Sequence, residues 1–228
     1  MKNLLCSAVF LLSIFVAAAQ DTIIAKNLQP FGTISLDGGI WGSIQQIPES
    51  APASLSICLN GNNADQVKWS IKDSVLSIRF SGTSRSNLPH VTIHYHQVGT
   101  LKLDAASVHF SDSLGTSLLS FLLQGGAKLT ADVSCDDLVL DVQGKSSALL
   151  RGDTRYLTIK ARNSAVDTRE LNAVSTTLEA SAISEAFVYG SERLVLEARD
   201  GASIFYRGNP AILRKNTLRS GRINYIGQ

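Results

Sequence analysis

Along the second half of the chain, apolar and polar residues alternate in short stretches that return at a nearly constant interval. Within each stretch the first, third and fifth positions are apolar, with Thr176 as the exception at a first position. Alternation with a period of two is typical of a β-strand that buries one face. The stretches begin 18 or 19 residues apart, at Leu101, Leu119, Leu138, Leu157, Thr176 and Leu194.

A repeat of this length predicts a solenoid, because one unit cannot bury its apolar edge without a neighbour. Small residues recur eight positions after most starts, as at Ala127 and Ala165, and glycine recurs fourteen positions after three of them. Both are suited to corners. We therefore expect an all-β fold, a right-handed parallel β-helix with coils of about 18–19 residues. A left-handed hexapeptide helix and an antiparallel sandwich are the alternatives.

The third positions of the repeat are the expected core column, with Leu140, Ile159, Leu178 and Leu196 stacked on adjacent coils. Upstream the repeat is looser, although residues 33–36, 54–59, 75–80 and 91–95 still alternate like strands. No helical pattern of useful length follows the first residues. The scarcity of proline and the lack of a linker indicate that residues 20–228 form a single β-helix domain.

The first nineteen residues read as a secretory signal peptide. Lys2 precedes an apolar run, 4–16, which is shorter than the roughly 20 residues that span a bilayer, and small residues follow at 17–19. We expect cleavage before Gln20 and export to the periplasm, the outer cell surface or the medium. No other stretch is long enough to cross a membrane, so the mature chain should have no transmembrane segment.

The remaining composition excludes some partners. The net charge is +2, and the charges are spread along the chain, so nothing points to nucleic acid. The mature chain keeps Cys58 and Cys135. About four coils at ~4.8 Å each would separate them, well beyond the ~7 Å that a disulfide allows between Cα atoms. We expect two free, mostly buried thiols.

Several segments resemble the bacterial family called putative auto-transporter adhesin, head GIN domain. They are FGTISLDGGIWGSI (31–44), VKWSIKDSVLSIRF (67–80), the Pro-x-Val-x-Ile-x-Tyr strand (89–95), LEARDGASIFYRGNP (196–210) and SGRINYIG (220–227). Trp41 departs from the family pattern, which favours an aliphatic or small residue there. The resemblance implies an exported β-helix from Gram-negative bacteria of the Bacteroides group, and it brings no catalytic residues and no established function.

Three histidines share one face of a strand, because His90, His94 and His96 stand at even spacing. Such an arrangement can bind zinc or copper. It is equally the outward polar side of a strand whose Val91, Ile93 and Tyr95 face the core. No acidic or cysteine residue lies nearby in sequence to complete a ligand set. We expect no metal and no other cofactor, and these histidines are the candidates should a metal bind.

One column of the repeat carries Asp141, Lys160, Glu179 and Glu197. Polysaccharide lyases and hydrolases built on β-helices need clustered carboxylates, whereas here Lys160 interrupts the acids as on a solvated sheet face. No nucleophile elbow, phosphate-binding loop or paired-cysteine motif appears. We therefore expect no catalytic residues and no enzyme, and a glycan-active enzyme is the alternative.

The remaining candidates are aromatic. Phe187 and Phe205 occupy the same repeat position, with Tyr189 two residues beyond the first, so we expect two outward rings about 4.8 Å apart. Together with Leu149 they would form an apolar stripe, which we expect the segment around Leu218, Ile223 and Tyr225 to cover. If the stripe is open instead, Phe187, Tyr189 and Phe205 are candidates for surface contact.

These observations favour a non-catalytic, exported β-helix with adhesin-like binding at the bacterial cell envelope. Its partner is unknown, and a glycan or a protein at the cell surface fits best. A purely structural envelope component would have the same sequence features.

Overall fold

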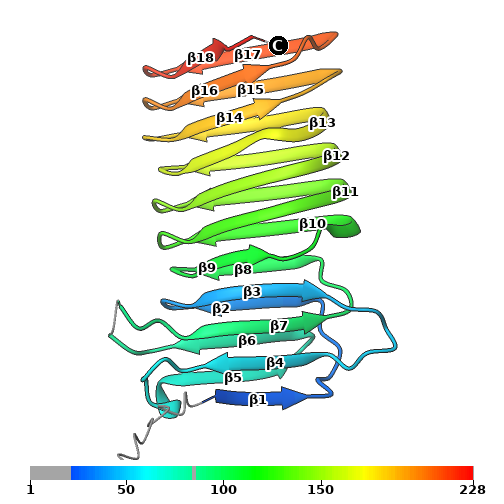
Figure 1. Cartoon of the computed structure of the whole chain (residues 1–228). Coiled ribbons are helices and arrows are strands. Elements are labelled where there is room, and N and C mark those ends of the chain that lie inside the picture. The colour runs from blue at the N-terminus through cyan, green and yellow to red at the C-terminus, as the bar shows by residue number, and fades with distance from the viewer. Residues whose placement is uncertain (1–21, 84–85, 228) are drawn as a thin grey trace, which may run out of the picture.

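The computed structural model describes residues 22–83 and 86–227, which form a tall stack of β-strands (Figure 1). The predicted signal peptide, 1–19, and the expected new terminus at Gln20 lie outside the described residues. The described part contains one short 3-10 helix, η1 (Ala64–Gln66), and no helix in it is long and apolar enough to span a membrane. The predicted β-helix is confirmed.

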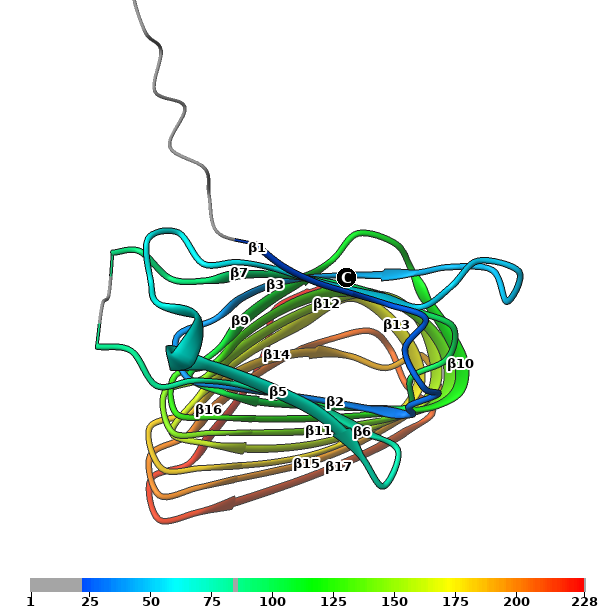
Figure 2. The same ribbon diagram turned by 90° about the horizontal axis from the view of Figure 1, so that it is seen from below.

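The strands line up as three walls around one core (Figure 2). The first wall contains, in stacking order, β5 (Val67–Lys72), β6 (Val75–Phe80), β2 (Thr33–Asp37), β8 (Thr100–Asp104), the later parts of β10 (Leu114–Gln124), β11 (Lys128–Gln143), β12 (Ser147–Arg162) and β13 (Ala165–Ser181), then β15 (Arg193–Arg199) and β17 (Ile212–Leu218). The second wall contains, in stacking order, β1 (Thr22–Lys26), β4 (Ser54–Cys58), β7 (His90–Tyr95), β3 (Trp41–Gln46), β9 (Ser107–Phe110), the early parts of β11 to β13, then β14 (Glu185–Tyr189), β16 (Ser203–Arg207) and β18 (Arg222–Tyr225). The third is shorter and pairs 114–116, 133–135, 152–154 and 171–173.

The core column lies on the inner face of the first wall. Leu140, Ile159, Leu178 and Leu196 are direct neighbours on successive coils and are at most 1% exposed, as predicted. Burying each such side chain contributes roughly 1.5–3 kcal/mol to folding. The same column continues toward the N-terminal end through Phe121, Leu101, Ile34 and Leu76.

Two details of the predicted repeat are wrong. Leu101 lies beside Phe121 rather than Leu119, so the first repeat is displaced by two residues. A slip of two keeps every side chain on its face, because strands alternate with that period, and the pattern therefore concealed it. The small residue at the corner before β13 is the buried Ser164 rather than the exposed Ala165.

The looseness of the upstream repeat has a topological cause. The coil made by β2 and β3 lies between the coil of β6 and β7 and the coil of β8 and β9, so stacking order departs from chain order. Three further pairings, β1–β4, β4–β7 and β5–β6, are antiparallel. An alignment of consecutive segments cannot detect a coil that is inserted out of order.

The last coil extends the walls and does not fold back over them. β17 pairs with β15 and β18 pairs with β16, in parallel register. The expectation that Leu218, Ile223 and Tyr225 cover an outer stripe is therefore wrong. Ile223 packs against the core beside Ile204, whereas Leu218 and Tyr225 are about half exposed.

Candidate binding surfaces

Phe187 and Phe205 form a stacked pair on the outer face of the second wall. They are register partners in β14 and β16, and their ring centroids are 4.8 Å apart with planes inclined by 15°. Their neighbours Val188 and Tyr206 point inward and are buried, which leaves the two phenylalanines facing outward and partly exposed. This placement and spacing agree with the sequence-based expectation.

The predicted apolar stripe is interrupted by a charge. Asp167 lies between Leu149 and Phe187 in the register, so Leu149 does not adjoin the aromatic pair. Arg169 binds Asp167 through an ion pair of 2.5 Å, and its guanidinium lies 4.5 Å from the centroid of the Phe187 ring. The hydrogen bond from Arg169 lowers the pKa of the Asp167 carboxyl. Contacts within the chain therefore fix the relative positions of Arg169, Phe187 and Phe205.

Tyr189 extends this surface toward the third wall. The guanidinium of Arg207 lies 5.6 Å from the Tyr189 ring centroid, and the same side chain donates a hydrogen bond to the backbone oxygen of Arg169. The backbone oxygen of Tyr189 accepts a hydrogen bond of 2.8 Å from the buried hydroxyl of Thr176. The position where the repeat has threonine in place of leucine is therefore the one that anchors Tyr189.

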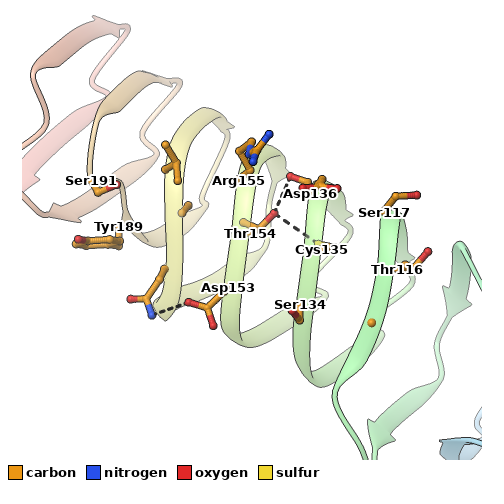
Figure 3. A pocket seen from close by; sticks show the side chains of 14 residues that line it. Thr116, Ser117, Ser134, Cys135, Asp136, Asp153, Thr154, Arg155, Tyr189 and Ser191 are labelled. Carbon is orange, nitrogen blue, oxygen red and sulfur yellow. Dashed lines mark hydrogen bonds between the residues drawn. The ribbon is translucent and has the colours of Figure 1, made fainter.

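A groove of about 680 Å³ runs along the outside of the third wall, across successive coils (Figure 3). Its floor is the column Thr116, Cys135, Thr154 and Ala173, whose members are register partners. The lining side chains lie in rows on either side of this floor, with Tyr189 and Ser191 at one end (Figure 3). The two rows are Gly115, Ser134, Asp153 and Asn172 on one side, and Ser117, Asp136, Arg155 and Val174 on the other.

Polar contacts order the groove. Asn172 donates to the Asp153 carboxylate at 3.1 Å, and the Cys135 thiol donates to the Thr154 hydroxyl at 3.5 Å. Burial raises the pKa of the Cys135 thiol, which keeps it protonated and a poor nucleophile. Sequence reasoning missed this groove. The signal was the 19-residue spacing of Thr116, Cys135 and Thr154, short polar side chains at positions that elsewhere carry core residues.

The three predicted histidines do not converge. The Nδ1 atom of His94 is 2.9 Å from the Ser54 hydroxyl, the Nε2 atom of His96 donates to the Ala51 backbone oxygen at 2.7 Å, and His90 is exposed. Within residues 22–83 and 86–227, no three His, Cys, Asp or Glu side chains come together as a metal site requires. His90 lies between Cys58 and the exposed Trp41 in the register of the second wall.

Among the residues that the structure describes, Cys58 and Cys135 are free thiols on different walls, and each is half-buried. The Cys58 thiol donates to the side-chain oxygen of Asn60 at 3.2 Å. The charged column lies on the outer face of the first wall as predicted, with Lys160 between Asp141 and Glu179, and Glu197 beside Glu179. Asn216 continues it on the last coil and lies 3.4 Å from the Glu197 carboxylate.

Comparison with known proteins identifies the family of β-helix proteins to which this chain belongs. Residues 31–210 match the model of the family described as putative auto-transporter adhesin, head GIN domain, and the chain belongs to that family. No curated protein matches the chain.

Solved structures share the fold. A putative adhesin from Bacteroides fragilis is 18% identical with a TM-score of 0.78, over 91% of this chain and 98% of its own. A putative adhesin from Parabacteroides distasonis is 16% identical with a TM-score of 0.71, over 91% and 98%. A putative lipid binding protein from the same organism is 15% identical with a TM-score of 0.69, over 90% and 96%. At these identities the likeness concerns the fold.

Proposed function

We propose that this chain is an exported, non-catalytic β-helix protein that binds a protein or glycan partner at the bacterial cell envelope, in the manner of an adhesin. The observation that carries the proposal is the outward pair of Phe187 and Phe205, which the C-terminal coil leaves uncovered. Aromatic and arginine side chains are the residues that most often dominate binding interfaces. Here Arg169, Arg207 and Tyr189 border the pair, already ordered by intramolecular contacts, so little conformational entropy is lost on binding.

Two alternatives receive less support. A glycan-active enzyme would need a convergent acid and base or a metal-bound carboxylate cluster, whereas the acidic column of the first wall is interrupted by Lys160. A lipid ligand, suggested by the name of one structural neighbour, would need an apolar cavity. The groove on the third wall contains Ala173, Val174 and Tyr189, but hydroxyl, amide, carboxylate or guanidinium groups line it at every level.

The test compares the mature chain, residues 20–228, with the double variant Phe187→Ser and Phe205→Ser on a glycan array and on immobilised bacterial envelope fractions. We expect specific binding by the wild-type chain and a loss of about tenfold or more in the variant. The matched control is Leu122→Ser with Val139→Ser, which removes two exposed apolar residues from the first wall and should leave binding unchanged.

Circular dichroism melting shows whether each variant is folded. A folded double variant that binds as well as wild type would contradict the proposal. A wild-type chain that binds no glycan and no envelope fraction would favour the purely structural alternative.

A further inference from the structure

The groove on the third wall runs across the strands, along the axis of the solenoid. It passes five levels of the stack, from residues 115–117 through 134–136, 153–155 and 172–174 to Tyr189 and Ser191. With ~4.8 Å between neighbouring strands, its length is about 19 Å. A ligand that fills it must therefore be extended and linear, and must offer similar chemistry at every level.

The lining restricts that chemistry. Every level contributes at least one short polar side chain, and the set contains both donors and acceptors, including Ser134, Asp153, Thr154 and Asn172. The lining contains two carboxylates, Asp136 and Asp153, and a single guanidinium, that of Arg155, which disfavours a polyanion. An acyl chain would desolvate these charged groups without offering them hydrogen bonds, which disfavours a lipid.

An extended peptide is also a poor fit. Peptides that add to a sheet pair with the unsatisfied backbone of an edge strand. The middle strands beneath the groove, 133–135 and 152–154, are each bonded to a neighbour on both sides. In the described part of the chain the end strand, 114–116, offers an edge, and a peptide added there would run along that strand and not along the groove. A ligand lying across these strands meets side chains instead of free backbone groups.

We infer that the groove is a binding site for a linear, uncharged oligosaccharide that lies along the solenoid axis, with Tyr189 as its stacking platform. This inference rests on the proposed function, because it takes the chain to be a binder and not an enzyme. Sugar hydroxyls both donate and accept hydrogen bonds, which matches the mixed lining. One pyranose of an extended β-linked chain is about as long as the spacing between coils, so successive sugars meet equivalent positions on successive levels.

Two groups of residues would set the direction and the position of the sugar chain along the groove. The Asn172 amide and Asp153 carboxylate, bonded to each other at 3.1 Å, present a donor and an acceptor on neighbouring coils for the hydroxyls of one sugar. At the C-terminal end, the Tyr189 ring can pack against the apolar face of a pyranose. Thr176 acts as a positioning residue, because its hydroxyl holds the Tyr189 backbone at 2.8 Å.

The experiment is isothermal titration of residues 20–228 with cello-, xylo-, manno- and chito-oligosaccharides of two to six sugars. We expect at least one series to bind, with an affinity that rises up to three or four sugars and then levels off. Tyr189→Ala and Asn172→Ala should each weaken that binding about tenfold. Tyr156→Ala removes a tyrosine that lies outside the groove and is more exposed than Tyr189, and it should change the binding less than about twofold.

The outcomes separate this site from the aromatic pair. No binding by any series, binding without a length limit, or binding that folded Tyr189→Ala and Asn172→Ala variants retain would overturn the groove assignment. If the double variant of Phe187 and Phe205 still loses binding to envelope fractions, the proposed function stands and only the groove assignment fails. If the groove variants alone lose oligosaccharide binding, the groove assignment stands without the aromatic pair.

Discussion

At the scale of single residues, the ion pair of Asp167 and Arg169 beside Phe187 should make the stability of the fold depend on pH. The pKa of Asp167 is lowered in the folded chain, first by the hydrogen bond from Arg169. The pair therefore stabilises the fold above the ordinary aspartate pKa of about 3.9. That contribution is lost as the pH falls through the lowered value, because protonation breaks the charge-assisted bond.

Melting temperatures measured between about pH 6 and pH 2.5 test this assignment. We expect Asp167→Asn to be less stable than wild type at pH 6 and to converge with it at the acidic end. Arg169→Gln should show the same flattening, since it removes the other partner of the bond. Parallel curves for all three proteins would show that the pair contributes nothing to folding.

The residues of the aromatic surface also show what could be predicted from the sequence and what could not. The outward stack of Phe187 and Phe205 was predictable, because a repeat position and a strand phase determine both direction and spacing. Asp167 and Arg169 were not, because an extra residue in β13 shifts the register after Leu149 and brings Arg169 over the Phe187 ring. A single irregular residue in one coil is invisible to a method that averages over coils.

At the scale of elements, β17 shows how the solenoid ends. Lys215 occupies the position of Leu196 in the core column, and its amine lies 5.5 Å from the Tyr206 ring centroid. In the described residues β17 pairs only with β15 in the first wall, so its other edge is open. An inward-pointing charge on an edge strand discourages pairing with a second chain.

Replacing this charge should promote association. We expect Lys215→Leu to sediment as a larger species than wild type, because the core column would then end in an apolar side chain beside the exposed Leu213. Lys215→Gln is the matched control, since it stays polar and should sediment like wild type. Equal sedimentation of Lys215→Leu and wild type would show that the lysine does not protect the edge.

The elements also explain the failed cover prediction. Leu218, Ile223 and Tyr225 were expected to cover an outer stripe, because an apolar stripe left exposed to water is unfavourable. The segment contains one more strand for each of two walls. Its pattern is obscured because Lys215 stands in a column that is otherwise apolar and Asn216 in a column that is mostly charged. A terminal coil has a solvated end and therefore departs from the composition of interior coils.

At the scale of the whole molecule, the solenoid places two neighbouring surfaces on one rigid body. The aromatic pair lies on the second wall and the groove on the third, and Tyr189 belongs to the border between them. The fold class and the inner columns could be predicted, because burial imposes the same periodicity on every coil. The groove could not be recognised in the same way, because the residues of its floor, Cys135 and Thr154 among them, lie outside the apolar columns of the repeat.

The central claim is that this β-helix binds its ligand without transforming it. The most direct measurement is mass spectrometry of the tightest-binding oligosaccharide or array glycan after prolonged incubation with excess wild-type chain. A binding protein should leave the ligand intact, with no new reducing ends and no unsaturated products, while titration under the same conditions shows saturable binding. Cleaved or unsaturated fragments that accumulate with time and protein concentration would identify the chain as a glycan-active enzyme instead.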